Sequence, residues 1–175
     1  MRDLAGQGAD SSHVGMEERA LTIPYTVYPS PAALPADWQE LYQMACTALD
    51  GAYAPYSQFS VGAAVALDNG KCVLGANQEN AAYPSGMCAE RVALYQAGAV
   101  HHGAKVLRIA VVARRNGVLL REPVFPCGAC RQALLEYANM TDEPVGVLMG
   151  SRATCLVLED ARQLLPFAFD SIGGQ

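Results

Sequence analysis

Three cysteines, placed at two points of the chain that both read as helix starts, constrain the fold more than any other feature of this sequence. Cys88 lies two residues before Glu90, and Cys127 and Cys130 follow 39 (127 − 88) and 42 (130 − 88) positions later in Pro-Cys-Gly-Ala-Cys. Cysteines at i and i+3 in a first helical turn share one face, and a third at a neighbouring helix start completes three thiolates for a tetrahedral ion. The fold must therefore bring two helix starts together.

The three-cysteine pattern favours an open, catalytic zinc site. Three protein ligands leave one position for water, whereas a structural zinc site is normally closed by a fourth protein ligand. Thiolates also gain from the positive ends of the two helix dipoles. A closed structural site and a redox pair are the alternatives, and a redox pair leaves Cys88 and Glu90 without a role. The spare candidates for a fourth ligand, none at motif spacing, are Cys46, Cys72, His101, His102 and Cys155.

Two arginines stand near the predicted ligands in the sequence. Three thiolates on Zn²⁺ leave a formal charge of about −1, which weakens the ion as a Lewis acid. Arg91 and Arg131 could offset this charge with hydrogen bonds to the sulfurs. Arg91 is therefore predicted to contact the ligands, while a solvated helix face is the alternative for both residues.

Composition and charge limit the function classes. The chain has 175 residues, of which 51% are hydrophobic and 17% charged, as expected of one folded domain. A net charge of −5 has the wrong sign for binding nucleic acid, so we expect a small, near-neutral ligand. The N-terminal region has no apolar segment of the kind that directs secretion, and the sequence has no run of about 18 apolar residues. We therefore expect neither secretion nor membrane insertion. Six cysteines then indicate reduced thiols and a cytoplasmic protein.

Strands are expected to alternate with helices, which predicts an α/β fold: a three-layer α/β/α sandwich around one mixed five-stranded sheet. Residues 1–30 are predicted to be a poorly ordered arm, and residues 31–175 a single catalytic domain. Helices are expected at residues 37–51, 88–98, 127–138 and 159–165. Strands are expected at residues 61–67 and 72–76, joined by the Asp-Asn-Gly turn at 68–70, and at 106–113, 145–149 and 154–158.

The motif residues carry a family resemblance. Cys-Ala-Glu followed by Pro-Cys-Gly-Ala-Cys matches the known signature of zinc-dependent deaminases. Over residues 37–169 the chain resembles the cytidine deaminase family, specifically its small homotetrameric branch. Residues 56–64, 77–83 and 164–169 are similar to further family landmarks, in the same order. The chain departs from the family at Phe125, at Ala76 and in the arm before Pro31.

The resemblance implies a substrate site and a subunit arrangement. Asn77 and Glu79 would bind the ribose hydroxyls, Phe59 would pack on the pyrimidine, and the Ala89 N–H would meet the base carbonyl. Tyr83 and Phe169 would reach a neighbouring subunit's pocket in a homotetramer. The backbone carbonyl at Phe125 would hold the amino group. The substrate-binding residues expected are Phe59, Asn77, Glu79, Ala81, Tyr83, Ala89, Phe125 and Phe169.

The activity expected is the hydrolytic deamination of cytidine and deoxycytidine to uridine and deoxyuridine with release of ammonia, in pyrimidine salvage. One Zn²⁺ per chain, held by Cys88, Cys127 and Cys130, would activate water for attack at C4 of the base, with Glu90 moving the protons. Three rivals remain: a deaminase of an aminonucleoside antibiotic such as blasticidin S, a polynucleotide deaminase, and a non-catalytic zinc module. Glu90 argues against the last, because a structural module needs no acid beside its ligands.

Overall fold

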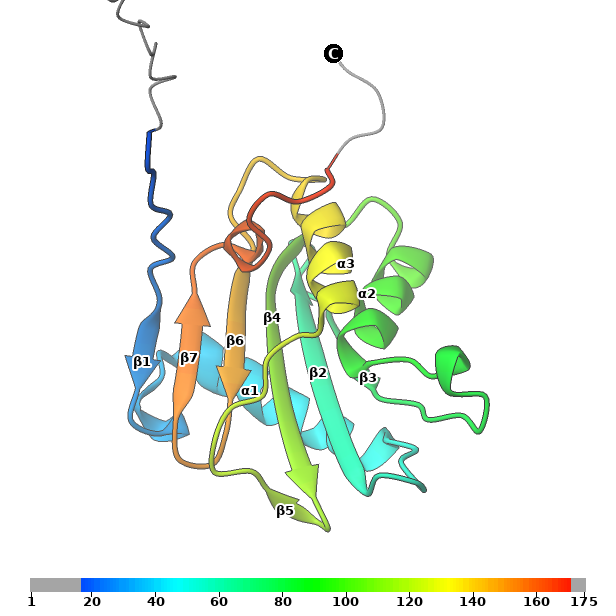
Figure 1. Ribbon diagram of the computed structural model, residues 1–175. Coiled ribbons are helices and arrows are strands. Elements are labelled where there is room, and N and C mark those ends of the chain that lie inside the picture. The colour runs from blue at the N-terminus through cyan, green and yellow to red at the C-terminus, as the bar shows by residue number, and fades with distance from the viewer. Residues whose placement is uncertain (1–16, 171–175) are drawn as a thin grey trace, which may run out of the picture.

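One mixed β-sheet organises the chain in the computed structural model, which describes residues 17–170 (Figure 1). The strands are β1 (Thr26–Tyr28), β2 (Phe59–Leu67), β3 (Cys72–Ala76), β4 (Val106–Arg115), β5 (Val118–Leu119), β6 (Gly146–Gly150) and β7 (Cys155–Leu158). They lie in the order β1-β7-β6-β4-β2-β3, and β5 pairs with the end of β4. The pair β4 and β6 is parallel and the other pairs are antiparallel.

Helices cover both faces of this sheet, which confirms the predicted three-layer α/β/α sandwich. Helix α1 (Ala36–Ala48) lies on one face, and helices α2 (Ala89–Val100) and α3 (Gly128–Ala138) lie side by side on the other (Figure 1). Each helix turns small and aliphatic residues toward the sheet, so its apolar stripe is buried. Within residues 17–170, no helix combines the length and the apolar character required to cross a membrane.

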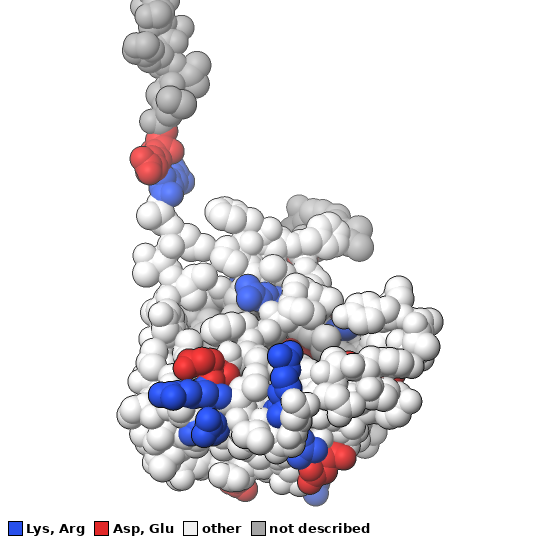
Figure 2. All heavy atoms as spheres, turned by 60° about the horizontal axis from the view of Figure 1, so that its bottom comes forward, with Lys and Arg blue, Asp and Glu red and all other residues white. Residues whose placement is uncertain are grey.

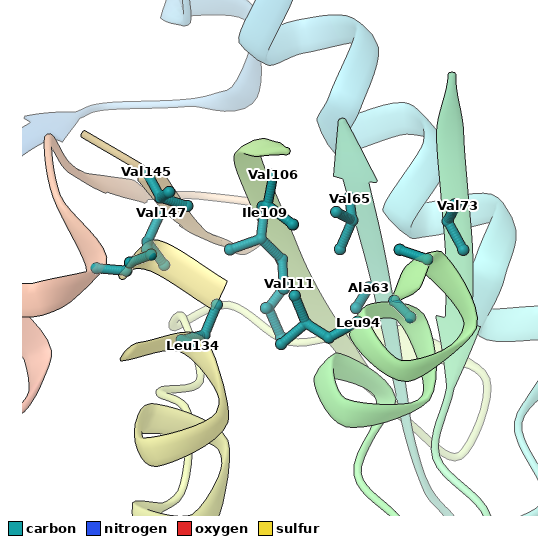
Figure 3. Close-up of a cluster of buried hydrophobic side chains, with 14 of the residues drawn as sticks. Ala63, Val65, Val73, Leu94, Val106, Ile109, Val111, Leu134, Val145 and Val147 are labelled. Carbon is teal, nitrogen blue, oxygen red and sulfur yellow. The ribbon is translucent and has the colours of Figure 1, made fainter. Parts of the chain in front are cut away.

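The larger core lies between the sheet and the pair α2 and α3. Figure 3 shows Val65 and Val111 of the sheet directed toward Leu94 of α2 and Leu134 of α3. These side chains are at most 1% exposed. Their burial removes apolar surface from water at about 25 cal/mol per Å² and fixes both helices against the central strands. A second core, under α1, includes Tyr42, whose hydroxyl donates to the Ser151 carbonyl at 3.0 Å.

The sheet has seven strands, so the prediction of five is wrong in number. The two additional strands are short: β1 has three residues and β5 has two. Strand β1 pairs with β7, more than a hundred residues away in sequence, with Thr26 opposite Val157. Strand β5 returns along β4 through Asn116 and Gly117, whose φ angles of 50° and 80° suit a tight hairpin turn.

The expected N-terminal arm is also in part ordered. Residues 17–25 are exposed and carry no regular secondary structure, but the segment that follows them forms β1 at the edge of the sheet. Residues 1–16, the remainder of the predicted arm, lie outside the described residues. At the other end of the chain, the helix expected at residues 159–165 is a single 3₁₀ turn, Ala161–Leu164, because Pro166 follows closely.

Glycine at position 75 allows α2 to approach the sheet. A Cβ at Gly75 would lie 2.4 Å from both the Ala89 carbonyl oxygen and the Ala93 amide nitrogen, which belong to the helix backbone and cannot turn aside. Strand β3 therefore contacts the first turns of α2 backbone to backbone. This contact fixes the position of the helix start, where Cys88 and Glu90 lie.

We expect Gly75→Ala to destabilise the protein because the added methyl group must push α2 away from β3. Overpacking of this kind costs about 1–3 kcal/mol, which at this chain length lowers the thermal midpoint by several degrees, roughly 2–4 °C per kcal/mol. Gly51→Ala is the matched control, since its Cβ would meet the Ala76 Cβ at an ordinary 3.6 Å. Thermal unfolding at equal protein concentration checks this, and equal midpoints for the two variants would contradict it.

Candidate metal centre and active site

The starts of α2 and α3 bring the three motif cysteines together. Cys88 and Cys127 are the residues that immediately precede the two helices, and Cys130 lies in the first turn of α3. The prediction that Cys88 lies within the first turn is therefore shifted by one residue. The three sulfur atoms lie within 4.8 Å of one another, and Cys130 is fully buried. Residues 39 positions apart in sequence (127 − 88) thus form one cluster.

The sulfur geometry fits a tetrahedral zinc ion. The Sγ atoms of Cys88 and Cys127 are 3.9 Å apart, and those of Cys127 and Cys130 are 3.5 Å apart. Zn–S bonds of about 2.3 Å at tetrahedral angles require sulfur atoms about 3.8 Å apart. Within residues 17–170 no further histidine, cysteine or carboxylate joins the cluster. The arrangement therefore has three protein ligands, and none of the spare cysteines and histidines closes it.

One thiol of the cluster, that of Cys88, has a lowered pKa. The hydrogen bond from the Cys130 thiol lowers the pKa of Cys88 to about 5, and the Arg91 guanidinium, whose Nη2 lies 3.9 Å from the Cys88 sulfur, acts in the same direction. The pKa of Cys130 is raised in turn, because its proton is shared with the Cys88 sulfur. Since metal ligation requires thiolates, a divalent cation would displace this shared proton.

Glu90 places a carboxyl group beside the sulfur cluster, in the first turn of α2. The residue is 4% exposed, and burial is the main cause that raises the pKa of its carboxyl above the ordinary value. The negative charge of Cys88 raises the pKa further, whereas hydrogen bonding and Arg91 lower it. A raised pKa makes the Glu90 carboxylate a better proton acceptor than an exposed carboxylate. This is the property that a general base requires.

The two arginines near the ligands have different roles. Arg91 places its Nη2 3.9 Å from the Cys88 sulfur, and its Nε atom is buried with no hydrogen-bond partner among the described residues. Arg131 instead donates from Nε to the Pro126 carbonyl at 2.9 Å and from Nη1 to the Leu164 carbonyl at 3.1 Å. Arg131 therefore holds the segment before Cys127 against the C-terminal 3₁₀ turn.

A cavity of ≈ 960 Å³ opens beside the cluster and is lined by Cys88, Glu90 and Cys127. Six of the eight expected substrate residues also line it. The cavity is thus large enough for a small organic ligand and has the candidate metal site in its wall. The expected residues in its lining are Phe59, Asn77, Glu79, Ala81, Tyr83 and Phe125.

The remaining two expected residues lie outside the cavity lining. Ala89 is fully buried, but as the first residue of α2 its N–H belongs to the helix-start amides that have no partner within the helix. Phe169 lies in the C-terminal segment, is 67% exposed, and its carbonyl accepts a hydrogen bond from Gln132 Nε2 at 2.8 Å. The structure therefore separates Phe169 from the cavity of its own chain.

Asn77 and Glu79 already bind the protein backbone. The Asn77 side chain accepts from the Val61 N–H at 2.8 Å and donates to the Phe59 carbonyl at 2.9 Å, so it continues the pairing of β3 with β2. Glu79 accepts from the Tyr56 N–H at 2.9 Å and from the Ser57 hydroxyl at 2.5 Å. The bond from Ser57 is the main cause that lowers the pKa of Glu79. Both side chains are thereby oriented at the cavity.

Sequence reasoning did not single out three residues of the cavity wall. Tyr56 and Ser57, which hold the Glu79 carboxylate, were named only within the family-like segment of residues 56–64. Arg115 was not identified as a candidate. An Asn-Gly pair directly after Arg115 was available as a signal, because it predicts a hairpin that ends β4 at this residue.

Comparison with known proteins agrees with the geometry of the site. Residues 35–142, more than half of the chain, match the family model described as the cytidine and deoxycytidylate deaminase zinc-binding region. The cytidine deaminase of Halalkalibacterium halodurans is 44% identical over 135 residues, which are 76% of this chain and 94% of that protein. The cytidine deaminase of Mycobacterium tuberculosis is 42% identical over 115 residues, 62% of this chain and 80% of that protein.

Solved structures of cytidine deaminases have a similar fold. The crystal structure of cytidine deaminase from Burkholderia pseudomallei superposes with a TM-score of 0.60 at 39% identity, over 74% of this chain and 97% of that one. The crystal structure of cytidine deaminase from Mycobacterium tuberculosis gives a TM-score of 0.60 at 35% identity, over 77% of this chain and 98% of that one. Because the family model, relatives matched over nearly their full length and the shared fold all coincide with the three-thiol site, the chain belongs to the cytidine and deoxycytidylate deaminase family.

Proposed function

We propose that this chain is a cytidine deaminase, which hydrolyses cytidine and deoxycytidine to uridine and deoxyuridine and releases ammonia. The observation that carries the proposal is the buried Glu90 carboxyl next to an open cluster of three thiols in the wall of a substrate-sized cavity. The relatives named cytidine deaminase support the choice of reaction. Pyrimidine salvage is the corresponding metabolic role.

Cys88, Cys127 and Cys130 would hold one Zn²⁺ per chain, and their sulfur spacings fit that ion. Zinc at this site would supply a Lewis acid that lowers the pKa of a water molecule in the fourth coordination position. The thiolate ligands must stay reduced, and all six cysteines are free, which supports a cytoplasmic enzyme.

Glu90 moves the protons in this proposal. It takes a proton from the attacking water and delivers a proton to N3 of the base, which makes C4 more electrophilic. After water adds at C4, Glu90 passes the second proton to the departing amine nitrogen, so that ammonia leaves and the carbonyl of the product forms. The buried position supports the first transfer, because burial raises the pKa of the carboxyl and makes it a better acceptor for the proton of the attacking water.

Substrate binding would use the rest of the cavity. Asn77 and Glu79 bind the ribose hydroxyls, for which their side chains keep unused acceptor and donor sites beside their backbone bonds. Phe59 packs on the pyrimidine, and the Ala89 N–H meets the base carbonyl. Ala81 and Tyr83, which both line the cavity, are further substrate-binding residues in this proposal. The Phe125 carbonyl holds the exocyclic amine.

A homotetramer is the proposed assembly. Tyr83 is 89% exposed, Phe125 58% and Phe169 67%, and Tyr83 and Phe125 line the cavity. Large exposed rings such as these, two at the cavity and one away from it, are favourable only if another surface covers them. A neighbouring copy would cover these rings and complete the wall of the cavity. The partners are thus a small nucleoside and further copies of the chain, with no nucleic acid and no membrane.

Cys88→Ala and Glu90→Gln are both expected to lose activity, but for different reasons. The first removes a ligand, so zinc content measured by elemental analysis should fall and thermal stability should fall with it. The second retains size and hydrogen-bonding shape, so zinc at one per chain, assembly and thermal midpoint should stay near the parent values. Activity of Glu90→Gln should nevertheless drop by at least about 10²–10⁴-fold. Substantial turnover by zinc-loaded Glu90→Gln would show that another group moves the protons.

Glu79→Gln is expected to slow the deamination of nucleosides and to leave the zinc content unchanged. Loss of a charged acceptor for the ribose should lower kcat/KM for cytidine by about 10–100-fold. The free base cytosine should be a poor substrate of the parent enzyme, because the sugar contacts position C4. Glu143→Gln, a change at an exposed residue outside the cavity, is the matched control. If kcat/KM were equal for cytosine and cytidine, the proposed role of Asn77 and Glu79 in binding the substrate would be wrong.

Light scattering at working concentrations should report a particle of about four times 18.6 kDa. Tyr83→Ser and Phe169→Ser should each weaken this assembly, since they remove the exposed rings that a second copy would cover. The KM for cytidine should rise as the tetramer dissociates. A fully active monomer would contradict the proposed role of these two residues.

A further inference from the structure

Residues 54–59 lead into β2 and form part of the cavity wall. Tyr56, Ser57 and Phe59 of this segment line the cavity, and so does Glu79, which follows β3 in the chain. In the proposed function Phe59 packs on the base and Glu79 binds the sugar. One short segment therefore lies between the group for the base and the group for the sugar, and Ser57 is the residue that hydrogen-bonds to both.

The Glu79 carboxylate accepts three hydrogen bonds from two adjacent residues. Its Oε1 accepts from the Ser57 hydroxyl at 2.5 Å, and its Oε2 accepts from the N–H groups of Tyr56 at 2.9 Å and of Ser57 at 3.3 Å. An ionised carboxylate offers about four lone-pair sites, shared equally by its two oxygens. Since the two N–H groups occupy those of Oε2, the site left for a sugar hydroxyl is on Oε1, the oxygen that Ser57 binds.

A second contact fixes the direction of the Ser57 hydroxyl. The Phe59 N–H donates to Ser57 Oγ at 3.0 Å. Because a backbone N–H can only donate, Ser57 Oγ must accept in that bond, and its single proton is left for Glu79. Hydrogen bonds in such a chain polarise one another. Ser57 thus joins the backbone of Phe59 to the carboxylate of Glu79.

The conformation of Gln58 sets the geometry of this link. Its φ angle of 55° lies in the left-handed region, which residues with a side chain adopt uncommonly. Its N–H donates to the Ala54 carbonyl at 3.1 Å, and its side-chain amide donates to the Pro55 carbonyl at 3.0 Å. Gln58 lines a separate cavity, whereas Ser57 and Phe59 both line the substrate cavity. The segment is therefore held by its own hydrogen bonds in an unusual conformation, which is common at binding sites.

Neutral groups, rather than a cation, orient Glu79 in the described part of the chain. Figure 2 shows several basic side chains, in blue, at the lower end of the molecule in Figure 1, where β2 begins. Within residues 17–170, however, no ion pair within 4.0 Å involves Glu79. The charge of Glu79 thus remains available to a sugar hydroxyl, and a hydrogen bond to a charged acceptor is stronger than one to a neutral acceptor.

The exposure of Ser57 indicates that its bond to Glu79 orients the carboxylate rather than stabilises the fold. Ser57 is exposed and Glu79 is half-buried, so water can replace the bond between them. Loss of such a bond changes the free energy of unfolding little. In a cavity wall, however, the bond limits the rotation of the Glu79 side chain and reduces the entropy that is lost when a sugar binds.

We propose that Ser57 is a positioning residue for the sugar: its hydroxyl holds Glu79 Oε1 in place to accept a hydrogen bond from one ribose hydroxyl. The inference rests on the proposed deaminase function and adds a residue to the same site. Ser57 acts through Glu79 and not on the reacting atoms, which lie beside Glu90. Loss of the hydroxyl should therefore weaken substrate binding and leave the chemical step nearly unchanged.

Ser57→Ala in the zinc-loaded, full-length enzyme should raise the KM for cytidine by about five- to tenfold and change kcat by less than about twofold. Zinc content and thermal midpoint should stay near the parent values. Ser57→Thr retains the hydroxyl and should bring the KM to within about twofold of the parent value. Ser60→Ala, the same change at a residue that lines the separate cavity, is the matched control and should leave the KM unchanged.

A double-mutant cycle tests whether Ser57 acts through Glu79. Adding Ser57→Ala to Glu79→Gln should lower kcat/KM by less than about a further twofold. A parent-like KM in Ser57→Ala, or independent losses that multiply in the double variant, would overturn the inference and leave the proposed function standing. A loss of zinc or of thermal stability in Ser57→Ala would overturn it too, in favour of a structural role. If the parent enzyme did not deaminate cytidine, the proposed function would fail and this inference with it.

Discussion

The site depends on holding the first residues of two helices within the reach of one metal ion, although thiolates so close together repel each other. Packing of the helix backbones resists that repulsion. Gly75 lets α2 contact β3 directly, and Arg131 ties the residue before Cys127 to the Leu164 carbonyl. Helix dipoles and the Arg91 guanidinium then act on the sulfurs that this framework holds in place. One of these contacts is made between backbones and the other by a side chain that bonds two backbone carbonyls, so both helix starts are held by the main chain of neighbouring segments.

Burial of Glu90 follows from the same arrangement. A carboxyl in the first turn of α2 must lie between the helix and the cavity, where it is 4% exposed and close to the thiols. Burial and the neighbouring negative sulfurs both oppose its ionisation, and a divalent cation in the cluster would favour it. The balance of these effects keeps both protonation states within reach, which a group that accepts and returns protons requires. The metal cluster therefore also sets the chemistry of Glu90.

Local patterns in the sequence predicted the helices, the longer strands and the cysteine cluster, because each depends on residues near one another or on a motif of fixed spacing. The features missed depend on distant partners. Strand β1 exists because Thr26 meets Val157, and three residues carry too little periodicity to be recognised. The environment of Arg115 arises from Phe59 on another strand. Strand β5 is the exception, since its Asn-Gly turn is a local signal that was overlooked.

The register of the central strands orders the chemistry of the cavity from one end to the other. The row through Val111 includes Gly75, which contacts the start of α2. Asn77 bonds to Val61, two positions further along β2, and Phe59 and Arg115 form the next row on the same face. Since side chains alternate between the faces of a strand, Ile109, Val111, Ala113 and Arg115 share one face of β4 after the irregularity at its start. A one-residue shift of β4 against β2 would turn Arg115 to the α1 side and bring Arg114 into the cavity. The side chains that line the cavity thus depend on the same register that positions the start of α2, and the hairpin turn at Asn116 helps to fix that register.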